Sequence, residues 1–253
     1  MGNSELFWNA FPEELKLGYI EKENHFICLL CGKEIEKGII YPEDGIYYDA
    51  KKYMDIHIEK THHSVFDFLI NLDKKLTGLT DHQKSLLRLF FEGKSDADIQ
   101  KEMGIGSVST IRNHRFLLKE KERQSKLFLT LMELLKEKDQ FAPIFIPLHK
   151  NAKMVDDRYN VTEDEKNKIL EKYFPTGIKG GLKTLPSKEK NKLIILREMA
   201  SQFENNRTYE EKEVNQILKN IYPDFVTLRR YLIEYGFMDR KPDGSQYWLK
   251  EGF

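Results

Sequence analysis

Three loop-rich stretches interrupt this chain of 253 residues, and they constrain its fold more than any other feature. They lie near 74–80, 139–161 and 175–186, where glycines, prolines and polar runs break the regular apolar patterns on either side. The chain is long enough for several small domains, so these joints favour separate modules over one large core. The predicted division is an N-terminal module at 1–75, a helical module at 76–138, a linker at 139–163 and a C-terminal module at 164–253.

The charge and hydropathy of the sequence restrict the kinds of partner and the cellular location that can be expected for this chain. The chain has 41 basic and 41 acidic residues, so its overall field neither requires nor excludes a polyanionic partner, and any nucleic-acid surface has to come from local charge. The sequence contains no run of about 18 apolar residues and no basic stretch followed by an apolar one at its N-terminus. We therefore expect no membrane span, no signal peptide and a cytoplasmic location.

The expected fold class is mainly α, within an α+β arrangement, because helical patterns dominate and the strand-like runs are short. In the N-terminal module, β-like runs at 26–30, 38–41 and 46–48 come first, and Gly45 marks a turn. A helical pattern follows from Ala50 onward. This order predicts a small β-rich knuckle followed by helices.

The only two cysteines, Cys28 and Cys31, form a C-x2-C pair, and His57 and His62 follow it. Two thiolates and two imidazoles are a ligand set that a structural tetrahedral zinc prefers, so these four residues predict a structural zinc site. His63 competes with His62 for the fourth position. A metal-free dithiol and a redox pair are the alternatives, and the lack of a βαβ pattern disfavours the redox pair. Four protein ligands leave no open coordination position, so we expect no hydrolytic role.

The helical module has the order of a helix-turn-helix. Its first apolar helix ends at Gly93, a residue suited to a left-handed cap. Ser95 then opens a short second helix in the manner of a capping box. A third helix begins near Ser107, and the leucines at 127–135 predict a separate fourth helix.

The third helix carries polar and cationic groups on the side away from its apolar seam of Ile111 and Leu118. From 107 to 126 there are six basic residues against two acidic ones, an excess that can neutralise DNA phosphates. In a helix-turn-helix the second of the two helices, here the third helix of the module, can enter the major groove. The candidate DNA-binding residues here are Ser109, Thr110, Arg112, Asn113, His114, Arg115, Phe116 and Lys119.

Residues 79–116 resemble the helix-turn-helix of LuxR/GerE-type regulators. The matching features are the opening Leu79-Thr80, E-G-x-S at 92–95, Ile99 and T-I-R-N-H at 110–114. The resemblance implies that Thr110, Arg112, Asn113 and His114 face DNA. It also implies that the fourth helix dimerises, whereas a leucine stripe equally fits an intramolecular core, and both interpretations stay open.

The C-terminal module has the order of a winged helix, with three helices before a β-hairpin. A capping box, Thr208-x-x-Glu211, is expected to open its second helix, and the hairpin turns at P-D-G, 242–244. Cations on the third helix and on the hairpin are positioned to reach phosphate: Arg229, Arg230, Arg240 and Lys241. Winged helices also bind proteins, and that alternative stays open.

Residues 185–248 are similar to a domain of unknown function found at the ends of bacterial transcription regulators. The motifs that carry this similarity are R-x-Y-x-E-K-E-V-N at 207–215, L-R-R-Y-L at 228–232 and D-G-x-x-Y-W at 243–248. The resemblance implies an association with regulation, and it supplies neither a reaction nor a ligand.

Together these patterns predict a non-enzymatic transcription regulator that binds double-stranded DNA sequence-specifically and holds a structural zinc, with a homodimer as a further expectation. The alternatives are a nuclease or recombinase targeted by the helix-turn-helix, and a protein-binding adaptor. The enzyme alternative is disfavoured because the carboxylates are spread along helices, and because the sequence has no Gly-rich phosphate loop. The sequence leaves open whether a small-molecule effector acts on this regulator.

Overall fold

A computed structural model describes residues 3–150, 152, 155–205 and 207–250. The chain divides into two units: Met1–Thr77 with Ile144–Phe253, and Gly78–Pro143 between them in sequence. The expectation of a mixed fold, mostly helical with small sheets, is confirmed. The outermost residues of the first and last predicted modules, 1–2 and 251–253, lie outside the described residues.

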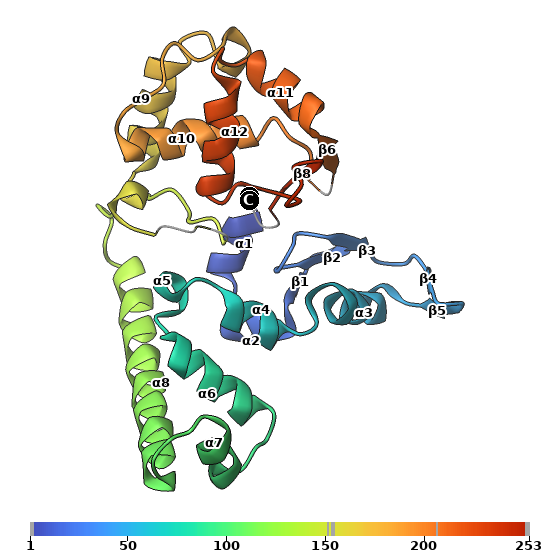
Figure 1. Cartoon of the computed structure of the whole chain (residues 1–253), viewed down its shortest axis with the longest axis vertical. Coiled ribbons are helices and arrows are strands. Elements are labelled where there is room, and N and C mark those ends of the chain that lie inside the picture. The colour runs from blue at the N-terminus through green and yellow to red at the C-terminus, as the bar shows by residue number, and fades with distance from the viewer. Residues whose placement is uncertain (1–2, 151, 153–154, 206, 251–253) are drawn as a thin grey trace. The chain divides into compact units, whose positions relative to one another are not determined.

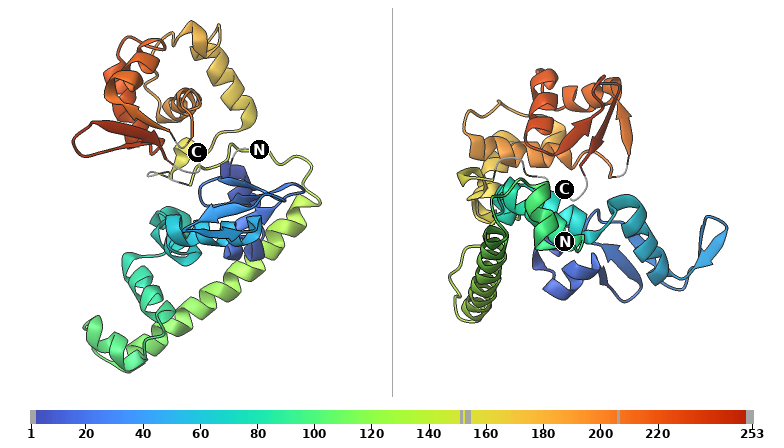
Figure 2. Two further views of the ribbon diagram at one scale, coloured as in Figure 1. Left: turned by 90° about the vertical axis from the view of Figure 1, so that its right-hand side faces the viewer. Right: turned by 60° about the horizontal axis from the view of Figure 1, so that its bottom comes forward.

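In the N-terminal module a three-stranded antiparallel sheet of order β1-β2-β3 packs against helices. In register, Phe26 lies opposite Glu21 on one side and Ile35 on the other. The β4–β5 hairpin projects beyond α3 (Figures 1 and 2). The elements are α1 (Asn3–Asn9), α2 (Pro12–Leu17), β1 (Tyr19–Glu21), β2 (His25–Cys28), β3 (Glu34–Glu36), β4 (Tyr41–Glu43), β5 (Ile46–Tyr48), α3 (Ala50–His62), α4 (Val65–Asn71) and α5 (Lys74–Thr77).

The predicted order of short strands followed by helices is present, and the runs at 26–30 and 46–48 correspond to β2 and β5. The strand predicted at 38–41 was wrong, because Gly38 has φ +82° in a turn and β4 begins only at Tyr41. The helix predicted from Ala50 does begin there, where the Asp49 side chain accepts the amide of Lys52 as an N-cap. The pattern did not predict α1, α2, β1 or β3, which are only three to seven residues long. Gly18 has φ +81°, and a Cβ there would lie 2.6 Å from Val65 Cγ2, so only glycine allows this close approach.

The second unit consists of α6 (Asp81–Phe91), α7 (Asp96–Glu102) and α8 (Val108–Lys136). Hydroxyl side chains cap all three: Thr80, Ser95 and Ser107 each accept a backbone amide of the first turn. Gly93 has φ +75°, as its predicted role at the helix end requires. The small core consists of Leu86, Leu89, Ile99 and Ile111.

The predicted third and fourth helices are one continuous helix, α8, of 29 residues (Figure 1). The prediction of a separate fourth helix was wrong because nothing in 108–136 breaks a helix: the segment has neither glycine nor proline. Ion pairs three residues apart, such as Lys119–Glu122 at 2.7 Å, further support it. Its C-terminal part, 127–135, exposes apolar side chains, and we refer to it as the apolar stretch of α8.

The C-terminal module has a larger core beneath a three-stranded antiparallel sheet of order β6-β8-β7. The predicted hairpin is present, with Asp239 opposite Trp248; it extends from the helices of this module (Figure 2). The elements are η1 (Asp157–Tyr159), α9 (Glu163–Tyr173), η2 (Ile178–Gly180), α10 (Glu189–Ala200), β6 (Thr208–Glu210), α11 (Glu211–Lys219), α12 (Phe225–Glu234), β7 (Met238–Arg240) and β8 (Gln246–Leu249).

Two parts of this module differ from the sequence-based expectation. Thr208 does not cap a helix, because 208–210 pairs with β8; instead Glu210 and Glu213 form the capping box of α11. Much of the predicted linker is packed, since Ile146, Tyr159 and Val161 are buried in the core of this module. None of the helices in the described part of the chain is both long and apolar enough to cross a lipid bilayer.

Candidate metal centre and nucleic-acid surface

The knuckle brings together the four predicted metal ligands. Cys28 and Cys31 come from the turn after β2, and His57 and His62 from the C-terminal half of α3. Their ligand atoms all lie within 4.8 Å of one another, with Cys31 Sγ 3.1 Å from His57 Nε2 and Cys28 Sγ 3.7 Å from His62 Nε2. Sulfur and nitrogen ligands of one tetrahedral zinc would stand about 3.5 Å apart. These residues could therefore hold a metal ion, and their identity is compatible with zinc.

Local structure shapes both sides of this cluster. Gly32 has φ +86°, and its amide donates to the carbonyl of Cys28 at 2.8 Å, which closes the turn carrying both cysteines. On the helix, His57 Nδ1 lies 3.1 Å from Thr61 Oγ1. Donation from Nδ1 to this hydroxyl leaves Nε2 free to bind a cation, the usual arrangement for a ligating histidine.

Burial and hydrogen bonding make the two thiols unequal. A hydrogen bond from Cys31, with a smaller contribution from the charge of Lys150, lowers the pKa of Cys28 to about 7 against the effect of burial. The same hydrogen bond, together with burial, raises the pKa of Cys31. Since the thiolate is the form that binds metal, the site favours ionisation of Cys28 first.

The competition between His62 and His63 is resolved in favour of His62. His62 is 8% exposed and belongs to the cluster. His63 lies just beyond the helix with φ +61°, exposed to solvent. The left-handed backbone turns its side chain out of the helical register that serves His57 and His62.

Sequence reasoning missed Lys150, which lies in the predicted linker. Its side chain is 1% exposed, and its ammonium donates to the carbonyls of Leu29 and Leu30, the two residues between the cysteines. The polar neighbours of Lys150 suggested a solvated loop. The apolar run at 144–148 just before it was the one available signal that this segment is packed.

In the second unit, α8 presents most of the predicted DNA-binding residues to solvent. Ser109, Thr110, Arg112, Asn113 and Phe116 are exposed, while Ile111, in the same turns, is fully buried against α6 and α7. In the described part of the chain no carboxylate pairs with Arg112. The start of α8 therefore has the buried seam and the polar outer face that the sequence pattern predicts.

The other residues predicted on this helix have partners within the unit. Arg115 pairs with Asp96 at 2.8 Å and lies over the Phe90 ring at 3.7 Å, so it braces α8 against α6 and α7. Lys119 pairs with Glu122. His114 is half-buried, with its ring 5.1 Å from that of His82.

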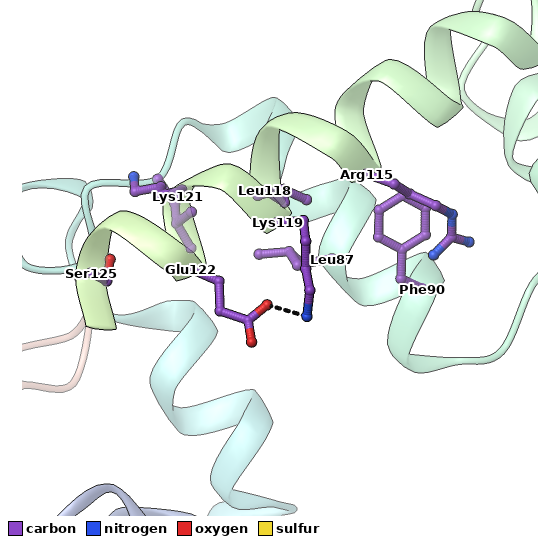
Figure 3. A pocket seen from close by; sticks show the side chains of 9 residues that line it. Leu87, Phe90, Arg115, Leu118, Lys119, Lys121, Glu122 and Ser125 are labelled. Atoms are coloured by element: carbon purple, nitrogen blue, oxygen red, sulfur yellow. Dashed lines mark ion pairs between the residues drawn. The ribbon is translucent and has the colours of Figure 1, made fainter. Parts of the chain in front are cut away.

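Arg115 and Lys119 also line a groove of about 570 Å³ between α6 and α8 (Figure 3). Its floor is apolar, with Leu87 and Phe90 from α6 and Leu118 from α8. The Lys119–Glu122 ion pair runs along the α8 side of this groove. The exposed residues Ser109, Arg112 and Asn113 are not among those that line this groove.

Of the four cations predicted to contact DNA in the C-terminal module, one is paired within the module and three are exposed. Arg229 is largely buried and ties α12 to α11 through Glu211 and Asn215. Arg230, Arg240 and Lys241 are exposed. The first two line a hollow of about 430 Å³ together with Val226 and Ile233.

Comparison with protein families matches the C-terminal part of the chain. Residues 181–249 match a family described as an uncharacterized protein conserved in bacteria (DUF2087). The matched region lies within the C-terminal module and overlaps the segment identified from its motifs at 185–248. No curated protein and no solved structure matches the chain.

Proposed function

We propose that this chain is a sequence-specific DNA-binding transcription regulator of bacterial origin, in which the start of α8 reads the major groove. The observation that carries the proposal is the exposed set Ser109, Arg112 and Asn113 above the buried Ile111. A short α7, a glycine-containing turn and the capped start of α8 form the arrangement that lets a helix N-terminus approach base edges.

The chemistry of these side chains supports the proposal. Arginine can bond a guanine edge with two donors, and asparagine can pair in the same way with adenine. Ser107 Oγ bonds the hydroxyls of Ser109 and Thr110, at 2.7 and 3.0 Å, so polar groups are gathered at the end where the helix dipole favours phosphate. LuxR/GerE-type regulators, which this segment resembles, use the same order of helices.

We assign the Cys28, Cys31, His57 and His62 cluster to a structural zinc. Two thiolates and two neutral imidazoles balance the charge of Zn²⁺, and four protein ligands complete a tetrahedron. The cluster joins the sheet to α3, so an ion bound there would hold the N-terminal module together. The C-terminal module, with its hairpin after three helices, is proposed as a winged helix whose exposed cations add a second phosphate contact.

We further propose that a second copy of the chain covers the apolar stretch of α8. Seven large apolar side chains between Leu127 and Leu135 are 39–68% exposed. A helix that is apolar on most sides is normally buried. A two-fold pair of chains would match a DNA site with two related halves, which connects this surface with DNA reading.

Selection of the purified full chain against a random duplex library tests DNA reading. We expect one motif to be enriched and to resist a non-specific polyanion competitor at moderate salt. On that motif, Arg112→Ala should weaken binding by roughly 5- to 150-fold, the loss typical of one base-reading arginine.

Arg123→Ala is the matched control, since it removes the same charge from the same helix. Arg123 is paired with Glu120, outside the predicted reading surface. We expect its affinity to stay close to that of the unmodified chain. Enrichment of no sequence, or equal losses for the two variants, would contradict DNA reading by α8 and favour the adaptor alternative, to which the apolar stretch of α8 also lends support.

A further inference from the structure

A buried lysine lies on the turn that carries the two cysteines. Lys150 comes from the segment that follows the second unit, and its ammonium donates to Leu29 O and, at 3.3 Å, to Leu30 O. The same ammonium lies 5.0 Å from the centre of the Phe7 ring. One side chain therefore contacts the turn between both predicted metal ligands and the helix α1 beside it.

A second contact fixes the same segment to α1. Trp8 Nε1 donates to the carbonyl of Leu148 at 2.7 Å, two residues before Lys150. On its other side, the segment enters the C-terminal module, where His149 is 2% exposed and stacks on Phe237. Its Nε2 donates to the carbonyl of Tyr235, so its Nδ1 accepts from the Tyr159 hydroxyl at 3.0 Å. Residues 148–150 thus join the knuckle to the core of the C-terminal module.

The environment of Lys150 depends on the shape of the knuckle turn. Burial of an ammonium is unfavourable by several kcal/mol unless hydrogen bonds and opposite charge compensate. Part of this compensation comes from the carbonyls of Leu29 and Leu30, which both reach the ammonium while the turn is closed by the bond from the Gly32 amide to the Cys28 carbonyl. An ion held by Cys28 and Cys31 would keep this turn closed, and loss of the ion would release it.

We propose that Lys150 is a positioning residue of the metal centre, which clamps the Leu29–Leu30 turn so that zinc binding and the seating of 148–150 stabilise each other. The proposal rests on the zinc site assigned above and adds to it a partner within the chain. Thermodynamic linkage makes the effect reciprocal: if bound zinc strengthens the seating of Lys150 by some factor, the seated lysine strengthens zinc binding by the same factor. Metal occupancy would in this way reach the C-terminal module.

Zinc affinity of the full chain, measured by competition with a chelator, tests the first half of this linkage. Lys150→Met keeps the apolar stem and removes the ammonium. We expect it to bind zinc about tenfold more weakly, within the usual range of coupling between sites. Lys37→Met is the matched control, because Lys37 also lies over an aromatic ring of this module, that of Phe26, but pairs with Glu21 instead of the cysteine turn. Its zinc affinity should be unchanged.

Hydrogen exchange of the same proteins tests the second half. The amide of Ala152 donates to His149 O, and the amide of Gly32 to Cys28 O, so each reports one side of the contact. Zinc removal from the unmodified chain should speed exchange at both amides. In zinc-loaded Lys150→Met, exchange should rise at Ala152 while Gly32 stays protected.

The proposal is overturned if Lys150→Met binds zinc as tightly as Lys37→Met, or if zinc removal leaves Ala152 protected. Should Lys150→Met not fold, Trp8→Phe replaces it: this variant keeps an aromatic ring and removes the bond to Leu148 O, and unchanged zinc affinity there would equally overturn the proposal. DNA selection is independent of these readouts. If the chain binds DNA sequence-specifically but zinc binding is not coupled to Lys150, only this inference fails. If the chain binds no zinc, the assignment of the zinc site fails as well.

Discussion

The C-terminal module and the second unit both contain a run of three helices with similar apolar patterns, α10–α12 and α6–α8, yet they bury very different amounts of apolar surface. In the C-terminal module, twenty-five described residues form one buried cluster. In the second unit the buried cluster has four, all on the inner faces of α6, α7 and α8. The same helical periodicity therefore produces a self-sufficient core in one region and a thin one in the other.

The difference shows where unsatisfied apolar surface remains. In the C-terminal module α12 packs against α10, α11 and β7, so few large apolar side chains reach solvent. In the second unit α8 extends well past α6 and α7, and its apolar stretch has no neighbour among the helices of that unit. We infer that the C-terminal module is stabilised from within, whereas the second unit gains stability from what binds to it.

The largest expected effect is on the C-terminal core. Leu232 is fully buried on α12, so Leu232→Ala should destabilise this module by about 2–5 kcal/mol through lost burial and a cavity. Leu131→Ala makes the same truncation on the apolar stretch of α8, where the side chain is 59% exposed. At high dilution it should leave the stability of the second unit nearly unchanged, and at high concentration it should weaken self-association.

Hydrogen exchange of core amides in each unit, with light scattering for the molecular mass, distinguishes these outcomes. Equal destabilisation by both variants in dilute solution would mean that Leu131 is packed within a single chain. The comparison between the two regions would then fail, and the dimer proposal with it.

Acid should act on the C-terminal module in particular. Burial lowers the pKa of His149 to about 4, well below its ordinary value of 6.5. The unfolded chain takes up this proton below pH 6.5 and the folded chain resists it, so stability is full above pH 6.5 and falls progressively toward pH 4. From that shift the loss is about 3 kcal/mol.

A pH titration of stability for the unmodified chain and for His149→Gln isolates this contribution. Glutamine can still donate to Tyr235 O, which His149 Nε2 contacts at 3.0 Å, but it does not titrate. The difference between the two curves should shrink as pH falls below 6.5. Parallel curves would show that His149 is accessible to protons in the folded module.

The smallest expected losses of stability come from alanine substitutions at two glycines with positive φ, and they compare the packing of the two regions directly. A Cβ at Gly181 of the C-terminal module would meet Ile221 O at 3.2 Å, whereas one at Gly93 of the second unit would meet nothing within 4 Å. Gly93→Ala should therefore cost about 1 kcal/mol for the backbone alone. Gly181→Ala should cost about 2–3 kcal/mol, since contact is added to strain. Thermal unfolding of each unit measures both, and equal losses would contradict the difference in packing.

Much of the fold could be predicted because its signals are local. Gly93, Ser95 and Ser107 end or begin helices through bonds within one turn, and the hairpin around 242–244 follows from its turn residues. Thr208 misled the prediction because its local capping signal competes with pairing to Trp248, forty residues away, and the tertiary pairing wins.

The four residues of the Cys/His cluster could also be predicted to lie together, because the chemistry of these residue types is specific and few cysteines compete. What the sequence did not reveal is the identity of their neighbours. Lys150 contacts the cysteine turn although 120 residues of chain separate it from Leu30. A charged residue next to polar neighbours gives no sequence signal that its side chain is buried. Arg115 and Arg229 were predicted as DNA contacts from their charge and their place on a helix, yet each pairs with a carboxylate that only the folded structure brings near.

The continuity of α8 has a geometric consequence. An unbroken helix of 29 residues is a rod about 43 Å long, and Arg112 stands about 28 Å along it from Leu131. If two chains cross at their apolar stretches, the distance between their reading ends follows from rod length and crossing angle alone, with no hinge to absorb a mismatch. Seven residues added between 119 and 126 would lengthen each arm by about 10 Å while nearly preserving its rotational phase. In such a dimer, this insertion would increase the number of base pairs between the two half-sites that the chains bind.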